Sequence, residues 1–247
     1  HNKGQVLRYW AKDIIANMQS ARPSPVELLV AVRDKVDEAF VAFQVAHTKA
    51  PESRYPHISR IQLIIEMSEG LIRAAAAQSQ LQGSTPTLQD LIRAGGSVAQ
   101  WLQSNIVVAE DDLQSVRYMR ADNDPSYIEK KTEADLSRLY GDFENVISVW
   151  ESLLGSDGES APVRRNLANA YYGRSQRRWE LMDPNNLERI TELMDENLAS
   201  DPTNGRDIRT WFQAARRLPS FSFNTALDRL SKWLRGAETA EAHFYLY

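Results

Sequence analysis

The sequence predicts an all-α fold, a superhelix of antiparallel helical hairpins with about ten or eleven helices and no sheet. Three observations support this. Apolar residues recur at spacings of three and four along most of the 247 residues, and no segment sustains the alternation typical of strands. The 11 glycines and 10 prolines gather between these periodic segments, so long helices are allowed. A short apolar motif also recurs along the chain.

The motif has a small or branched residue, a large apolar residue four positions later, and a third position three residues further on. Its copies are Ala39-Phe43-Ala46, Val146-Trp150-Leu153, Ile190-Met194-Asn197 and Ala226-Leu230-Trp233. The first copy, with Pro51 after it, resembles the second helix of a tetratricopeptide repeat. The spacing of the later copies is 44 and then 36 residues, whereas a regular array repeats at about 34. We therefore expect a divergent tetratricopeptide-like array.

The first part of the chain, 1–121, should hold long helices. We expect them at 3–19, 25–48, 57–81 and 88–119. Ser24 is suited to cap the second helix, with Pro25 at its first position. The pair Gly95-Gly96 predicts a kink or a close helix contact in the fourth. The inward stripe expected for the first helix is Val6, Leu7, Trp10, Ile14 and Met18.

The turn residues 121–125, Ala-Asp-Asn-Asp-Pro, predict a boundary between 1–121 and a second part with shorter, more regular hairpins, 126–247. Together the two parts would form one continuous α-solenoid. The helices expected in the second part are 126–140, 143–154, 161–179, 185–199, 206–218 and 224–234. Residues 240–247 are typical of a helix that has just begun, so we expect the chain to be a fragment of a longer polypeptide.

Four tryptophans are spread through the second part, at helix-packing positions. They are Trp150, Trp179, Trp211 and Trp233. We interpret them as core residues rather than as a platform on which nucleic-acid bases stack.

Composition limits the possible functions. Hydrophobic residues make up 43% of the chain and charged residues 25%, as in ordinary globular proteins. The net charge of −4 argues against a surface that binds nucleic acid everywhere, although it allows a local basic patch. The absence of cysteine excludes disulfides and agrees with a cytoplasmic location. No apolar run approaches the length of a membrane span, so no membrane partner is expected.

No catalytic, cofactor or metal site is expected. The sequence has no P-loop, no dinucleotide-binding glycine pattern and no His-Glu-x-x-His motif. The histidines at 1, 47, 57 and 243 are scattered, and we interpret them as surface or packing residues. The acidic run 110–112 is interpreted as a solvated helix face, because adjacent helical residues point in different directions.

An arginine-rich polar cluster is the candidate binding surface. On one helix Arg165, Asn169 and Tyr172 share a face, while Leu167, Ala168 and Tyr171 should face the partner helix. Such a surface suits an acidic peptide, a phosphate or a nucleic-acid backbone. Pairing within the chain, with acids such as Glu159, Glu180, Asp183, Glu188, Glu192 and Asp207, is the favoured alternative. The candidate residues are Arg165, Asn169, Tyr172, Arg174, Arg177, Arg206, Arg209 and Arg216.

Several segments are similar to one family. They include Arg164-Arg165-Asn166-Leu167, the run from Asp207 to Arg216, the tail 240–247, and the segments 4–6 and 50–53 near the start. They resemble the tetratricopeptide-like region of large antiviral STAND-type P-loop ATPases, bacterial relatives of the animal innate immune effectors that carry a sterile-alpha-motif domain. The resemblance implies a parent protein with an ATPase and an effector domain upstream of this chain, acting in antiphage defence.

The resulting functional hypothesis is a non-catalytic sensor or autoinhibitory region of such a defence ATPase. Its partners would be proteins: a phage trigger, upstream domains of the same chain, or further copies of itself. Two alternatives remain open, a nucleic-acid-binding repeat that uses the arginine-rich helices and a generic scaffold unrelated to defence.

Overall fold

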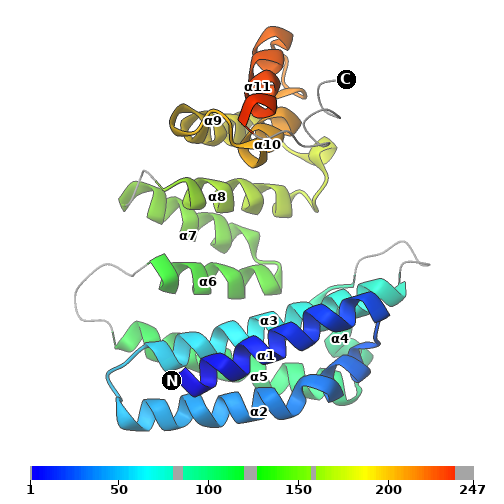
Figure 1. The fold of residues 1–247 in the computed structure, drawn as a ribbon, viewed down its shortest axis with the longest axis vertical. Coiled ribbons are helices and arrows are strands. Elements are labelled where there is room, and N and C mark those ends of the chain that lie inside the picture. Colours follow the sequence, from blue (N-terminus) through cyan, green and yellow to red (C-terminus); the bar gives the residue numbers. More distant parts are fainter. Residues whose placement is uncertain (1, 80–85, 120–126, 157–159, 237–247) are drawn as a thin grey trace. The chain divides into compact units, whose positions relative to one another are not determined.

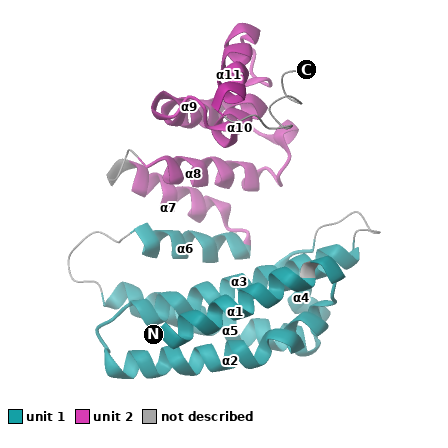
Figure 2. Cartoon of the chain, viewed as in Figure 1, with its two compact units in different colours: residues 1–140 teal, residues 141–247 magenta. Residues whose placement is uncertain are grey.

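The computed structural model describes residues 2–79, 86–119, 127–156 and 160–236 (Figure 1). These residues contain eleven α-helices, two short 3-10 turns and no strand, which confirms the all-α prediction. The chain divides into two compact units, residues 1–140 and 141–247 (Figure 2). The division therefore lies one helix later than the turn at 121–125. The expected terminal helix at 240–247 lies outside the described residues.

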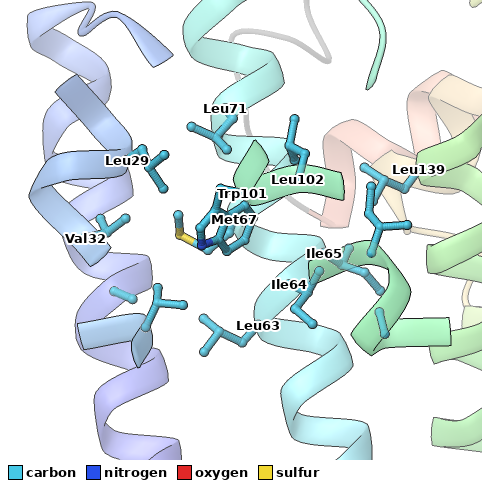
Figure 3. Packing of buried hydrophobic residues seen from close by; sticks show 14 of the residues in the cluster. Leu29, Val32, Leu63, Ile64, Ile65, Met67, Leu71, Trp101, Leu102 and Leu139 are labelled. Atoms are coloured by element: carbon cyan, nitrogen blue, oxygen red, sulfur yellow. The ribbon is translucent and has the colours of Figure 1, made fainter. Parts of the chain in front are cut away.

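Unit 1 is organised around one central helix, α3. This helix contacts α1, α2, α4, α5 and α6, and it is buried on several sides, from Ile61 through Leu71. Side chains from α2, α3, α5 and α6 form the surrounding core (Figure 3). A helix with apolar residues on most sides requires neighbours on most sides. The helices of unit 1 are α1 (Asn2–Met18), α2 (Pro25–Lys49), α3 (Tyr55–Ser79), α4 (Leu88–Ala94), α5 (Gly96–Tyr118) and α6 (Tyr127–Tyr140), with the 3-10 turn η1 (Gln19–Ala21).

Local signals at helix ends behave as expected. Ser24 caps α2 in a reciprocal arrangement: its hydroxyl accepts from the Glu27 N–H at 3.2 Å, and the Glu27 carboxylate accepts from the Ser24 N–H at 2.7 Å. The predicted kink at Gly95-Gly96 is a complete break between α4 and α5. Gly95 has φ 74°, a conformation that glycine adopts without a steric cost.

The predicted inward stripe of α1 is wrong at Val6 and Trp10, whereas Leu7 is buried and Ile14 and Met18 pack partly buried against the core. The buried positions are Gly4, Leu7, Ala11 and Ile15, whereas Trp10 and Val6 are 53% and 50% exposed. A Cβ atom at position 4 would overlap the ring of Phe43 on α2. Gly4 and Ala11 therefore allow a close approach of the neighbouring helices, and the large indole of Trp10 is turned outward.

The interpretation of residues 110–112 as a solvated face is wrong for Asp112, which is only 2% exposed. Its carboxylate accepts two hydrogen bonds from Arg60, each at 2.5 Å, and lies 2.5 Å from Nδ1 of His57. Nε2 of His57 lies 3.2 Å from Nδ1 of His47. The carboxylate is thus buried with its countercharge, as buried ions require.

Unit 2 is a succession of packed helices in which α7 contacts α8, α8 contacts α9, α9 contacts α10, and α10 contacts α11. This order of contacts is typical of helical repeats, so a helical-repeat array is compatible with it. One superhelix along the whole chain stays a prediction. The elements are α7 (Phe143–Ser156), α8 (Ala161–Arg174), the 3-10 turn η2 (Trp179–Leu181), α9 (Pro184–Ser200), α10 (Gly205–Ala215) and α11 (Phe223–Gly236).

The motif residues of unit 2 form its core. The last three copies of the motif are buried throughout, including the polar Asn197, which is 2% exposed. The Asn197 side chain donates to the Ala161 carbonyl and accepts from Arg164, both at 3.4 Å. An asparagine at this position therefore tethers α9 to the start of α8. Trp150, Trp211 and Trp233 are core residues as predicted.

The first testable prediction concerns Gly205, at the start of α10. A Cβ atom there would overlap the indole of Trp233, which is only 4% exposed. We expect Gly205→Ala to lower the free energy of unfolding by about 1–3 kcal/mol, because overpacking forces the ring to move. Urea unfolding followed by circular dichroism measures the loss. In a Trp233→Leu background the same change should cost much less, and equal losses in both backgrounds would contradict the overlap.

Candidate binding groove on unit 2

A groove of about 460 Å³ lies on unit 2 between α8 and α10 and is closed at one side by Trp179. Four of the predicted residues line it: Asn169, Tyr172, Arg209 and Arg216. The remaining lining residues are Ala168, Trp179, Thr210, Gln213 and Arg217. None of these nine side chains is acidic, so the lining offers mainly hydrogen-bond donors and positive charge.

An aromatic pair forms one wall of the groove. The rings of Tyr172 and Trp179 are stacked, with centroids 4.6 Å apart and an interplanar angle of 28°. The predictions of a helix through residue 179 and of a core role for Trp179 are wrong. Helix α8 ends at Arg174, and the Trp179 side chain is half-buried at the groove.

The turn after α8 explains the position of Trp179. Gln176 and Arg177 both have positive φ, 55° and 58°, and the Arg177 N–H donates to the Tyr172 carbonyl at 3.0 Å. These left-handed residues end the helix and reverse the chain, which brings the indole back against Tyr172. Each costs roughly 1–2 kcal/mol for a residue other than glycine, and such backbone strain tends to cluster at ligand-binding sites.

Two neighbouring arginines, Arg216 and Arg217, bring positive charge to the groove. The Arg217 guanidinium donates to the Gln213 carbonyl at 2.5 Å and lies 5.9 Å from the centroid of the Trp179 ring. Arg216 lies 5.8 Å from the centroid of the Phe212 ring. Within the described ranges, neither arginine forms an ion pair with a carboxylate. Burial, together with the adjoining Arg216 cation, lowers the pKa of Arg217, against the opposing effect of Glu180.

Other predicted arginines hold the structure together, as the alternative interpretation proposed. Arg165 donates two hydrogen bonds to Asp207, both at 2.6 Å, and the Asp207 residue is fully buried. The Arg174 guanidinium donates to Glu144 at 3.0 Å. The pair between Arg165 and Asp207 joins α8 to α10 and so positions both walls of the groove without lining it.

The two remaining candidates, Arg177 and Arg206, lie outside the lining of the groove. Both are exposed; Arg177 belongs to the left-handed turn, and Arg206 is in the first turn of α10. Among the groove residues that were not candidates, Gln213 had a readable signal on α10. It follows the candidate Arg209 by four positions and so shares its helix face.

A second cavity, of about 420 Å³, lies in unit 1 between α1, α3 and α6. Three carboxylates line it, and each is paired: Glu66 with Arg8 at 2.7 Å, Glu69 with Arg138 at 2.5 Å, and Asp135 with Lys131. The lining keeps more cations than carboxylates, but each of its cations forms an ion pair with one of these three carboxylates. The groove on unit 2 differs because no carboxylate lines it.

The described residues contain neither a cluster suited to a metal ion nor a helix suited to crossing a membrane. In residues 2–79, 86–119, 127–156 and 160–236, no cluster of three or more His, Asp or Glu side chains is arranged to hold a metal ion. Over the same ranges, no helix combines the length and the apolar character that crossing a membrane requires.

Comparisons of the chain with protein-family models, with curated proteins and with solved structures found no match.

Proposed function

We propose that this chain is a non-catalytic interaction module that captures an acidic segment of a protein partner in the groove on unit 2. The observation that carries the proposal is the pair Arg216 and Arg217, which faces a groove without a single acidic lining residue. Guanidinium groups bind carboxylates and phosphates through paired hydrogen bonds, and an unbalanced pair of them favours an anionic ligand.

The helical architecture supports the same proposal. Stacked helical hairpins commonly present a continuous surface on which an extended partner lies. The resemblance of the sequence to the repeat region of antiviral STAND-type ATPases suggests where such a module would act. We propose a sensor or autoinhibitory role in a defence ATPase, with a phage protein, an upstream domain of the same polypeptide or another copy of the chain as partner.

One observation favours a second candidate, binding of single-stranded nucleic acid. The stacked rings of Tyr172 and Trp179 stand beside arginines, and proteins that bind single strands combine aromatic rings with basic side chains. This candidate predicts that the logarithm of the affinity for an oligonucleotide falls steeply with the logarithm of the salt concentration.

The second testable prediction separates the candidates. The full chain should bind fluorescently labelled peptides rich in glutamate and aspartate, and Arg216→Ala with Arg217→Ala should weaken binding at least tenfold, because hydrogen bonds to charged groups are lost. Fluorescence anisotropy measures the affinities. The matched control, Arg177→Asn with Arg206→Gln, removes the same charge outside the groove and keeps a residue suited to the left-handed turn.

Either of two results would reject the acidic-segment proposal. One is equal weakening by the groove variant and by its control, which would indicate attraction by net charge alone. The other is binding of oligothymidylate in preference to every acidic peptide, which would favour the nucleic-acid candidate.

A further inference from the structure

The groove on unit 2 concentrates donors in a way that suits an anion with many acceptor oxygens. Arg216 and Arg217 are consecutive residues directly after the end of α10, and Arg209 within α10 lines the groove with them. Asn169, Thr210 and Gln213 add neutral polar groups. A carboxylate offers two oxygens and one negative charge. A phosphate monoester offers three terminal oxygens and a charge of about −1.5 to −2 at neutral pH.

The charge balance separates these two ligands. Neither of the two neighbouring guanidinium groups forms an ion pair with a carboxylate among the described residues, and Glu180 offsets only part of the charge of Arg217, so more than one positive charge is left to be neutralised. One phosphate dianion neutralises both from a single side chain, whereas carboxylates would have to come from two residues held close together. Each guanidinium group can donate two parallel hydrogen bonds to two oxygens of a phosphate. The three terminal oxygens of a phosphate therefore accept from more guanidinium donors than the two oxygens of a carboxylate do.

The aromatic wall suits the organic part of a phosphorylated side chain. The stacked Tyr172 and Trp179 rings lie in the same groove as the two arginines, so an anionic group held by the guanidiniums keeps its stem or ring against an apolar face. The volume of about 460 Å³ is within the range of about 300–1,000 Å³ typical of ligand pockets.

The geometry points to a phosphorylated side chain on the partner as the ligand, and we propose that its phosphate lies between the guanidinium groups of Arg216 and Arg217, with its organic part against Tyr172 and Trp179. The inference rests on the proposed function, since it specifies which acidic segment the groove accepts. Phosphoserine and phosphotyrosine share the required chemistry, and the experiment distinguishes them.

The third testable prediction uses pools of peptides with a fixed central residue and randomised flanks. The central residue is phosphoserine, phosphotyrosine, glutamate or serine. We expect the full chain to bind at least one phosphorylated pool at least tenfold more tightly than the glutamate pool. Trp179→Ala should lower the affinity for the phosphotyrosine pool more than the affinity for the phosphoserine pool if the phosphotyrosine ring stacks on the indole.

Two further readouts test the phosphate itself. Arg217→Lys should lower the affinity for the phosphorylated pools more than the affinity for the glutamate pool, because lysine keeps the charge but cannot donate two parallel hydrogen bonds. Lowering the pH from 7 to 5 should also weaken the phosphorylated pools. The second pKa of a phosphate monoester is about 6, whereas a glutamate with its pKa of about 4.3 stays mostly ionised at pH 5.

The outcomes are distinguishable. Equal affinity for the glutamate and phosphorylated pools would overturn the phosphate inference and leave the acidic-segment function standing. Binding to none of the three acidic pools would reject both. A third result is displacement of every bound phosphorylated pool by oligothymidylate at a lower concentration than the unlabelled phosphorylated peptides need. That result would identify a nucleic-acid backbone as the preferred source of phosphate and would overturn the inference as well. Phosphate-dependent binding that Arg216→Ala and Arg217→Ala abolish, and that the Arg177 and Arg206 control retains, supports it.

Discussion

Replacing Arg165 by alanine should lower the free energy of unfolding of unit 2 by about 3 kcal/mol. The change leaves Asp207, which is 0% exposed, without the two hydrogen bonds that compensate its charge. Breaking a buried ion pair by removal of one partner costs about 3–5 kcal/mol, and the 22% exposure of the Arg165 side chain places this pair near the lower end. Urea unfolding with amide hydrogen exchange of α8 and α10 measures the loss.

A double-mutant cycle provides the control for Arg165. In an Asp207→Asn background the buried carboxylate is gone, so Arg165→Ala should cost at least 1 kcal/mol less than in the natural chain. Arg165→Lys should recover only part of the stability, because lysine cannot make the two parallel hydrogen bonds. Equal costs in both backgrounds would show that Arg165 acts without Asp207. Arg165 would then again be a candidate for binding a ligand.

The second large effect is expected for Trp150→Ala in α7. Trp150 is 3% exposed and belongs to a motif copy that is buried at all three positions. Truncating a buried tryptophan to alanine removes apolar contact and leaves a cavity, at a cost of about 3–5 kcal/mol. We expect the urea transition of unit 2 to shift accordingly and hydrogen exchange in α7 and α8 to accelerate.

Trp10 is the matched control for Trp150. It is the same residue type in a helix, but it is 53% exposed, and its only described ring contact is the Lys35 ammonium 5.6 Å from its centroid. Trp10→Ala should therefore cost about 1 kcal/mol or less. A loss below 1 kcal/mol for Trp150→Ala would contradict the packing of the α7 helix.

Much of the fold could be predicted because the relevant signals are local. Ser24, Pro25 and Glu27 fall within one helical turn, so the start of α2 is readable from four residues. The glycine pair at 95–96 interrupts the helix for a reason intrinsic to glycine. Helical periodicity likewise located the buried Leu167, Ala168 and Tyr171 on α8.

The candidate groove was only partly predictable. Asn169 and Tyr172 were selected because they share a helix face, and Arg209 and Arg216 because they belong to a second basic group further along the chain. These faces meet in one groove through the packing of α9 against α8 and α10 and through the pairing of Arg165 with Asp207, 42 residues later in the chain. The sequence contains several arginines and several acidic residues, but it does not show which arginine forms an ion pair with which carboxylate.

The all-α class, the approximate position of the helices and the presence of an arginine-rich candidate surface can all be read from the amino-acid sequence. Those properties follow from periodicity, capping and turn residues, whose effects extend over a few positions. Three features instead arise from packing in the folded chain: α1 turns Trp10 outward, Asp112 is buried, and Trp179 lines the groove. Each of these features depends on a contact between residues distant in the sequence or on the left-handed turn after α8. Local sequence signals allow several side-chain arrangements, and close packing in the folded chain selects one of them.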